Sequence, residues 1–229
     1  MNQTIYLIDD EPAILSSLSA LLGTVGWQTR TYSSALAFQQ GVGELHGLTG
    51  CLLLDIRMPG KTGLTLLEEW RRQGLAIPVI IMTGHANIDL CRRAFKNGAF
   101  EFLTKPIDAD LLFEVVGSAL EQQQNLQERQ QKIRLMQHRL ATLTAREQDI
   151  FEHIMQGNSS KEIARVFALS PRTVEAHRAN IFAKLDVNSL PKLMNEYGEL
   201  ALLKKCKNAL LLMKMGRKSR PKGILGKIT

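Results

Sequence analysis

The chain has 229 residues, which is enough for two domains, and its 45% hydrophobic and 22% charged residues are typical of globular rather than disordered proteins. Its three distant cysteines form no CxxC pair, and its N-terminal MNQTIYLIDD is not a signal peptide, so we expect a cytoplasmic protein with no zinc site, disulfide framework or membrane partner. The net charge is +7, but residues 200–229 hold nine basic residues and no acidic one. The rest of the chain is therefore not basic overall.

Short apolar runs alternate with longer amphipathic runs over residues 1–120. The apolar runs predict strands at 5–8, 29–32, 51–55, 79–83 and 100–104. The amphipathic runs predict helices at 12–25, 34–40, 64–73 and 88–96, and one from residue 108 onward. Five β/α units in series predict an α/β doubly wound domain, a five-stranded parallel sheet of flavodoxin-like order 2-1-3-4-5 with helices on both faces.

Residues 121–142 are rich in glutamine and contain no glycine or proline, so we expect a helical linker. Apolar residues recur there at heptad spacing: Leu126, Ile133 and Leu140 every seven residues, with Met136 and Leu143 at the intervening position. Two interpretations stay open at this point, a short coiled-coil seam and an exposed spacer helix.

Residues 143–199 predict a small all-α domain, because helix-start signals follow one another closely. Each start has a residue that can cap a helix: Thr144, Ser159, Ser170 and Ser189. A glutamate stands three residues after each of the first two, which completes the capping-box pattern. The net charge of this domain is close to zero, and its basic side chains include Lys161, Arg172, Arg178 and Lys184.

The basic tail, residues 200–229, has two possible interpretations. It is either a solvated extension or an arm that contacts DNA phosphates.

Carboxylates gather at the carboxyl ends of neighbouring strands in the expected sheet. Asp9 and Asp10 follow the first strand and Asp55 ends the third, so we expect the three side chains to converge where ligands bind. Three like charges that close need a counter-cation, and an oxygen-only cluster suits Mg²⁺ or Mn²⁺. Thr83 ends the fourth expected strand and Lys105 comes directly after the fifth, so both should lie at the same edge of the sheet. A cation, a hydroxyl and an ammonium around one carboxylate fit phosphoryl transfer to that carboxylate.

Four motifs in this order, IDDE, LLLDIRMPGKTGL, MTGH and FLTKP, resemble the receiver domain of two-component response regulators. The resemblance implies that Asp55 accepts a phosphoryl group from a sensor histidine kinase, that Lys105 pairs with this group and that the Lys105–Pro106 bond is cis. It implies oxygen ligands for Mg²⁺: Asp9 (through water), Asp10, Asp55 and the carbonyl of Arg57. It also implies a switch pair, Thr83 and Phe102.

Residues 143–194 resemble the LuxR-type helix-turn-helix module of the FixJ/NarL group. The turn ALS between helical runs 163–167 and 171–185 gives the spacing that presents the second helix to the major groove of DNA. A wheel of 171–185 places Val174, Ile181 and Leu185 on the core face. The residues expected to contact DNA are Lys161, Arg172, Thr173, Glu175, Ala176, Arg178, Ala179 and Asn180. By chemistry, Arg172 suits guanine, Asn180 adenine and Glu175 cytosine.

We therefore expect a DNA-binding response regulator of a bacterial two-component system rather than an enzyme. Phosphorylation of Asp55 would promote homodimerisation on promoter half-sites and transcription regulation, with activation expected and RNA polymerase as a further partner. One alternative is a phosphorylation-independent (orphan) transcription regulator. Another is a phosphatase of the haloacid-dehalogenase type, which predicts an aspartate two residues after the nucleophile, where this chain has Arg57.

Overall fold

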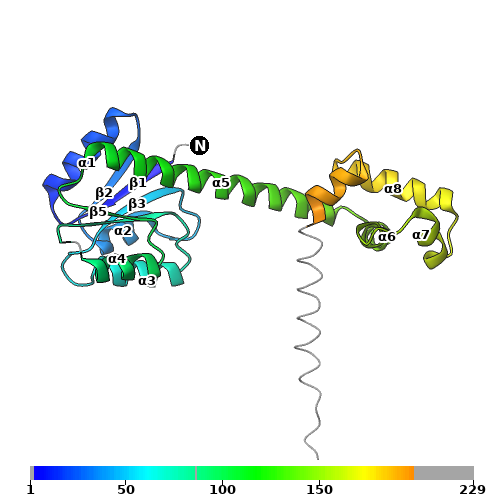
Figure 1. Ribbon diagram of the computed structural model, residues 1–229, viewed down its shortest axis with the longest axis horizontal. Helices are drawn as coiled ribbons and strands as arrows, with labels where there is room; N and C mark the ends of the chain where they lie inside the picture. The colour runs from blue at the N-terminus through cyan, green and yellow to red at the C-terminus, as the bar shows by residue number, and fades with distance from the viewer. Residues whose placement is uncertain (1–2, 86, 199–229) are drawn as a thin grey trace, which may run out of the picture. The chain divides into compact units, whose positions relative to one another are not determined.

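The computed structural model describes residues 3–85 and 87–198, so the basic tail lies outside the described residues. The chain divides between Gln130 and Gln131 into two compact units, which are described separately (Figure 1). Within the described ranges, no helix combines the length and the hydropathy that crossing a membrane requires.

The first unit contains a parallel five-stranded sheet in the order β2-β1-β3-β4-β5, which confirms the predicted topology. The strands are β1 (Thr4–Ile8), β2 (Gln28–Tyr32), β3 (Gly50–Asp55), β4 (Val79–Thr83) and β5 (Glu101–Thr104). Every residue of β3 and β4 is buried, whereas the edge strand β2 is largely exposed. The continuous apolar runs in β3 and β4 thus reflect strands that are covered on both faces.

Helices cover both faces of the sheet, as Figure 1 shows. They are α1 (Pro12–Thr24), α2 (Ala35–Val42), α3 (Gly63–Arg72), α4 (Ile88–Lys96) and α5 (Ala109–Ala141). One core packs α1 and the first part of α5 against the sheet, and the other packs α2, α3 and α4 against the opposite face. Side chains at the N-caps accept backbone hydrogen bonds in three helices: Ser34 in α2, Thr62 in α3 and Asn87 in α4.

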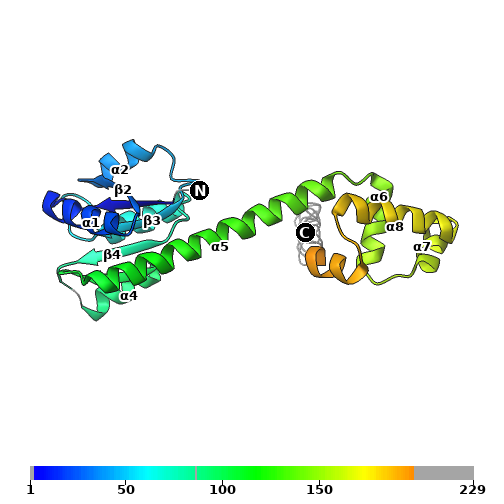
Figure 2. The same cartoon turned by 90° about the horizontal axis from the view of Figure 1, so that it is seen from above.

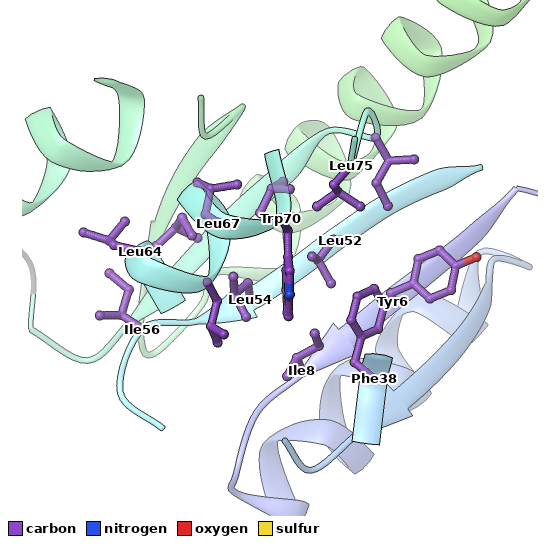
Figure 3. Close-up of a cluster of buried hydrophobic side chains, with 14 of the residues drawn as sticks. Tyr6, Ile8, Phe38, Leu52, Leu54, Ile56, Leu64, Leu67, Trp70 and Leu75 are labelled. Atoms are coloured by element: carbon purple, nitrogen blue, oxygen red, sulfur yellow. The ribbon is translucent and has the colours of Figure 1, made fainter. Parts of the chain in front are cut away.

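Aromatic side chains fill the core between the sheet and helices α2 and α3 (Figure 3). Trp70 of α3 is completely buried, and its ring centroid lies 5.1 Å from that of Phe38 in α2. Phe38 also meets Tyr6 of β1 edge to face, with centroids 5.7 Å apart. Such pairs stabilise beyond the apolar area that they bury. This core fixes the strands whose ends carry the charged residues described below.

The second unit contains the last turns of α5 with α6 (Ala145–Met155), α7 (Ser160–Phe167) and α8 (Pro171–Leu185), and residues 190–198 are also helical (Figure 2). Both predicted capping boxes are confirmed, at Thr144 with Glu147 and at Ser159 with Glu162. The three residues predicted for the core face of α8 are completely buried: Val174, Ile181 and Leu185. Ala168 adopts a left-handed conformation (φ 52°) at the end of α7, which turns the chain toward α8.

The end of α5 packs into the core of the second unit. Met136 is 7% exposed, and Leu140 packs against the same cluster as Leu143. By contrast, Leu126, five residues into the expected linker, is 42% exposed. Arg139 donates to the Leu185 carbonyl and to the Asp186 carboxylate at the end of α8. The last part of the heptad pattern thus packs within its own unit, because these apolar residues cover the start of the helical domain.

Candidate phosphoacceptor site and DNA-binding surface

Three charged side chains meet at the carboxyl ends of β1, β3 and β5. Asp9 directly follows β1, Asp55 ends β3 and Lys105 directly follows β5. The Lys105 Nζ atom lies 2.6 Å from Oδ2 of Asp9 and 2.7 Å from Oδ1 of Asp55. Asp9 and Asp55 are 0% and 3% exposed, so water screens these ion pairs only weakly. One ammonium group therefore bridges two buried carboxylates.

The electrostatic balance at Lys105 favours its charged form. Burial lowers the pKa of the amine, but hydrogen bonds to Asp55 and Asp9 outweigh that effect and raise the pKa above its ordinary value. A third carboxylate, Glu11, reaches within 3.8 Å of the same nitrogen. Lys105 is thus a cation at neutral pH and can neutralise charge that develops on Asp55.

The backbone around Asp55 holds its carboxylate in place. Its Oδ2 atom accepts a hydrogen bond of 2.5 Å from the Arg57 N–H, which leaves Oδ1 for Lys105. Gly63 begins α3 against this segment and donates its N–H to the Ile56 carbonyl at 2.9 Å. A Cβ atom on Gly63 would lie 2.3 Å from the Asp55 carbonyl oxygen. Only glycine allows α3 to begin so close to the end of β3.

Of the three carboxylates expected at this edge, the structure joins two, Asp9 and Asp55, through Lys105. Among residues 3–85 and 87–198, no three His, Cys, Asp or Glu side chains are grouped closely enough to hold a metal ion together. Asp9 is completely buried on Lys105, whereas the next residue, Asp10, is exposed and lines an adjoining groove. Lys105 supplies the counter-cation between the two buried carboxylates.

An open groove of about 810 Å³ adjoins the acidic edge and contains both Asp10 and Arg57. Its other lining residues come from the β3–α3 and β4–α4 segments: Ile56, Met58, Pro59, Thr62, His85, Asn87 and Leu90. The oxygen donors of Asp10, Asp55 and the Arg57 backbone are the hard ligands that Mg²⁺ prefers. This donor set fits Mg²⁺ in type.

Thr83 and Phe102 lie on the adjacent strands β4 and β5. Thr83 ends β4 and is completely buried, and its hydroxyl accepts a hydrogen bond of 3.3 Å from the His85 N–H. Phe102 is partly buried and packs against the core on the α2, α3 and α4 side. The Lys105–Pro106 bond is cis, which confirms that prediction.

Sequence reasoning missed the loop residues Glu11, His85 and Asn87. Glu11 follows the aspartate pair directly, and His85 stands two residues after Thr83. Their polar character next to strand-end residues was the available signal. Their contacts depend on the path of the loops, which hydrophobic patterning does not specify.

The exposed face of α8 carries most of the residues that are expected to contact DNA. Six of them are exposed: Arg172, Thr173, Glu175, Ala176, Ala179 and Asn180. Lys161 is exposed near the start of α7. His177 and Arg178 are partly buried. The Arg178 guanidinium lies 5.9 Å from the Phe182 ring centroid, and its Nε atom lies 4.0 Å from Oε2 of Glu175.

Lys184 has a structural partner within the helical domain. Its Nζ atom lies 2.6 Å from Oε2 of Glu147, whose side chain is 5% exposed. The hydrogen bond from Lys184 holds the pKa of Glu147 below its ordinary value. This pair ties the ammonium group of Lys184, one of the few basic residues of the domain, to the start of α6.

A doubly wound parallel sheet with charged side chains at one edge, followed by a helix-turn-helix unit, indicates a DNA-binding regulator of the two-component class. Residues 5–117 match the family model of the response regulator receiver domain, and residues 141–196 match that of the bacterial regulatory proteins of the luxR family. The chain therefore belongs to the DNA-binding response regulators of two-component systems. The receiver implies a sensor kinase as partner, the luxR-family domain implies DNA binding, and receiver domains in general bind Mg²⁺.

Individual relatives are similar to this chain over most of its length. The transcriptional regulatory protein FixJ of Bradyrhizobium diazoefficiens is 38% identical over 191 residues, which are 83% of this chain and 92% of FixJ. The response regulator TmoT of Ectopseudomonas mendocina is 35% identical over 190 residues, 83% of this chain and 86% of TmoT. A solved structure of the response regulator StyR matches with a TM-score of 0.76 and 31% identity, covering 87% of this chain and all of StyR.

Proposed function

We propose that this chain regulates transcription under the control of Asp55 phosphorylation by a sensor histidine kinase. The observation that carries this proposal is the bridge from Lys105 to Asp55, next to an open groove that is lined by the following residues Ile56 and Arg57. A buried carboxylate with an adjacent cation and an accessible approach is suited to accept a phosphoryl group.

In this mechanism, the Asp55 carboxylate attacks the phosphorus atom, and the bond from phosphorus to the donor histidine nitrogen breaks. The Arg57 N–H orients Oδ2, and Lys105 neutralises negative charge on the phosphorylated side chain. Asp10, Asp55 and the Arg57 carbonyl would hold Mg²⁺, with Asp9 assisting through water. A bound Mg²⁺ would neutralise charge on the oxygens of the transferring group.

The phosphoryl group would then be sensed by Thr83 and Phe102. The Thr83 hydroxyl, now bonded to the backbone of His85, would turn to a phosphoryl oxygen. Phe102 would move further into the space beside β4 and reshape the face formed by α4 and β5. That face would pair two chains, so the phosphorylated homodimer places two DNA-binding units on promoter half-sites.

On DNA, α8 would enter the major groove. Arg172, Thr173, Ala176, Ala179 and Asn180 would face the bases, while Lys161 and Arg178 would contact phosphates. We propose transcription activation in the cytoplasm, with RNA polymerase as a further partner, and no metabolic activity.

Covalent modification tests the first step. Intact-mass spectrometry of the full chain after incubation with a small acyl phosphate and Mg²⁺ should show the mass of one added phosphoryl group. Peptide mapping should place this group on Asp55, and Asp55→Asn should acquire none. Equal modification of the variant would assign the phosphoacceptor elsewhere.

A further inference from the structure

One carboxylate stands on the surface that would face the DNA polyanion. Glu175 lies in the first half of α8, and its side chain is 63% exposed. It neighbours Ala176 and lies in the same helix as Ala179, and both alanines are exposed and small enough to let the helix backbone approach a partner closely. A free carboxylate at such a place would be repelled by phosphates. Its presence there therefore calls for a specific role.

The carboxylate of Glu175 is held in place from another helix. The hydroxyl of Ser160, the first residue of α7, donates a hydrogen bond to Oε1 of Glu175. Arg178 lies one turn further along α8, with its Nε atom 4.0 Å from Oε2. Val174, the preceding residue, is completely buried and fixes the rotation of the helix. Glu175 is thus oriented before any ligand arrives, which lowers the entropic cost of binding.

An ionised carboxylate accepts hydrogen bonds and donates none, and this property selects among bases. In the major groove, guanine presents only acceptors and thymine presents an acceptor and a methyl group, so both oppose a carboxylate. Adenine presents a donor beside an acceptor. Cytosine presents its N4 amino group as a donor without an adjacent acceptor on the same base.

We propose that Glu175 is a specificity-determining residue that selects cytosine at one position of each DNA half-site, and that Ser160 is its positioning residue. This inference rests on the proposed function and adds the identity of one base that the site requires. Glu175 accepts from cytosine N4 through the oxygen sites that Ser160 leaves free, and it rejects guanine at that position.

The test selects bound DNA from a random pool with the full chain, Mg²⁺ and a small acyl phosphate. The wild-type chain should prefer cytosine over guanine at one position by about tenfold or more, which is a typical effect of one mismatched base pair. Glu175→Gln, which carries both a donor and an acceptor, should shift that position to adenine. Glu175→Ala should remove the preference there and leave the other positions unchanged.

Two further variants separate base selection from general charge effects and from structural effects. Ser160→Ala should weaken the preference at the same position, and Ser160→Thr, which keeps the hydroxyl, should restore it. Glu152→Gln removes an exposed charge on α6 and should change no base preference. Thermal unfolding should show that all variants remain folded.

The contrary results are distinct. If Glu175→Gln raises the affinity for all sequences equally and shifts no base preference, Glu175 only repels phosphates and the inference is wrong. If the wild-type chain selects no sequence at all, the proposed function itself fails, and this inference fails with it.

Discussion

The Lys105 ammonium nitrogen lies 2.7 Å from Oδ1 of Asp55, and the same nitrogen lies 2.6 Å from Asp9. Lys105→Met keeps the stem and removes the charge, which leaves two buried carboxylates without their shared partner. We expect the free energy of unfolding of the first unit to fall by about 3 kcal/mol. Denaturant titration followed by tryptophan fluorescence measures this unit, because Trp27 and Trp70 both lie in it.

The matched control for that substitution is Lys61→Met. Lys61 forms an ion pair of 2.7 Å with Glu69, but its side chain is 60% exposed. We expect this change to cost less than about 1 kcal/mol because water screens the pair. Equal losses for the two lysines would contradict the importance of the buried bridge.

Gly63→Ala should strain the backbone at the phosphoacceptor. The added Cβ atom would lie 2.3 Å from the Asp55 carbonyl oxygen, so β3 or the start of α3 must shift. We expect a loss of about 2 kcal/mol in the same denaturant titration. Gly23→Ala in α1 is the control, since nothing lies within 4 Å of its added Cβ atom. That change should stabilise by about 0.5 kcal/mol, and a stabilising Gly63→Ala would contradict the packing described.

The ion pair of Glu147 with Lys184 predicts a pH dependence of the second unit. The pKa of Glu147 is lowered in the folded state, chiefly by the hydrogen bond from Lys184. Its contribution to stability is therefore present above the ordinary glutamate pKa and lost as pH falls through the lower, folded value. Glu147→Gln should cost about 2 kcal/mol at neutral pH and much less in strong acid. Thermal unfolding by circular dichroism measures both, and a pH-independent difference would exclude this linkage.

The end of α5 should stabilise the second unit through its buried apolar residues. Met136→Ala removes a side chain that is 7% exposed in the helical core, and we expect a loss of about 3 kcal/mol. Leu126→Ala in the same helix changes a side chain that is 42% exposed and should cost less than about 1 kcal/mol. Circular dichroism during thermal unfolding compares the two variants. Equal losses would favour a continuous coiled-coil seam over packing within the unit.

Strand ends and helix caps could be predicted because local patterns specify them. Asp55 and Lys105 follow apolar runs, and parallel strands bring such positions to one edge of a sheet. Thr144 and Ser159 lie at the spacing of capping boxes. These signals need no knowledge of distant contacts.

Tertiary contacts account for what the sequence did not show. Asp9 and Asp10 are adjacent and chemically equal, yet only the fold buries one on Lys105 and exposes the other. Ser160 and Glu175 lie fifteen residues apart, and the angle between α7 and α8 decides that they meet. The spacing of polar residues carries no information about these pairs.

The most direct test of phosphorylation control measures oligomeric state and DNA affinity in the same samples. Sedimentation and titration with selected promoter DNA would compare the wild-type chain and Asp55→Asn, each with and without a small acyl phosphate and Mg²⁺. We predict that only the treated wild-type chain dimerises, with DNA affinity raised about tenfold, within the usual range of coupling between sites. If the treatment changes neither property of the wild-type chain, or changes both equally in Asp55→Asn, the chain binds DNA without control through Asp55.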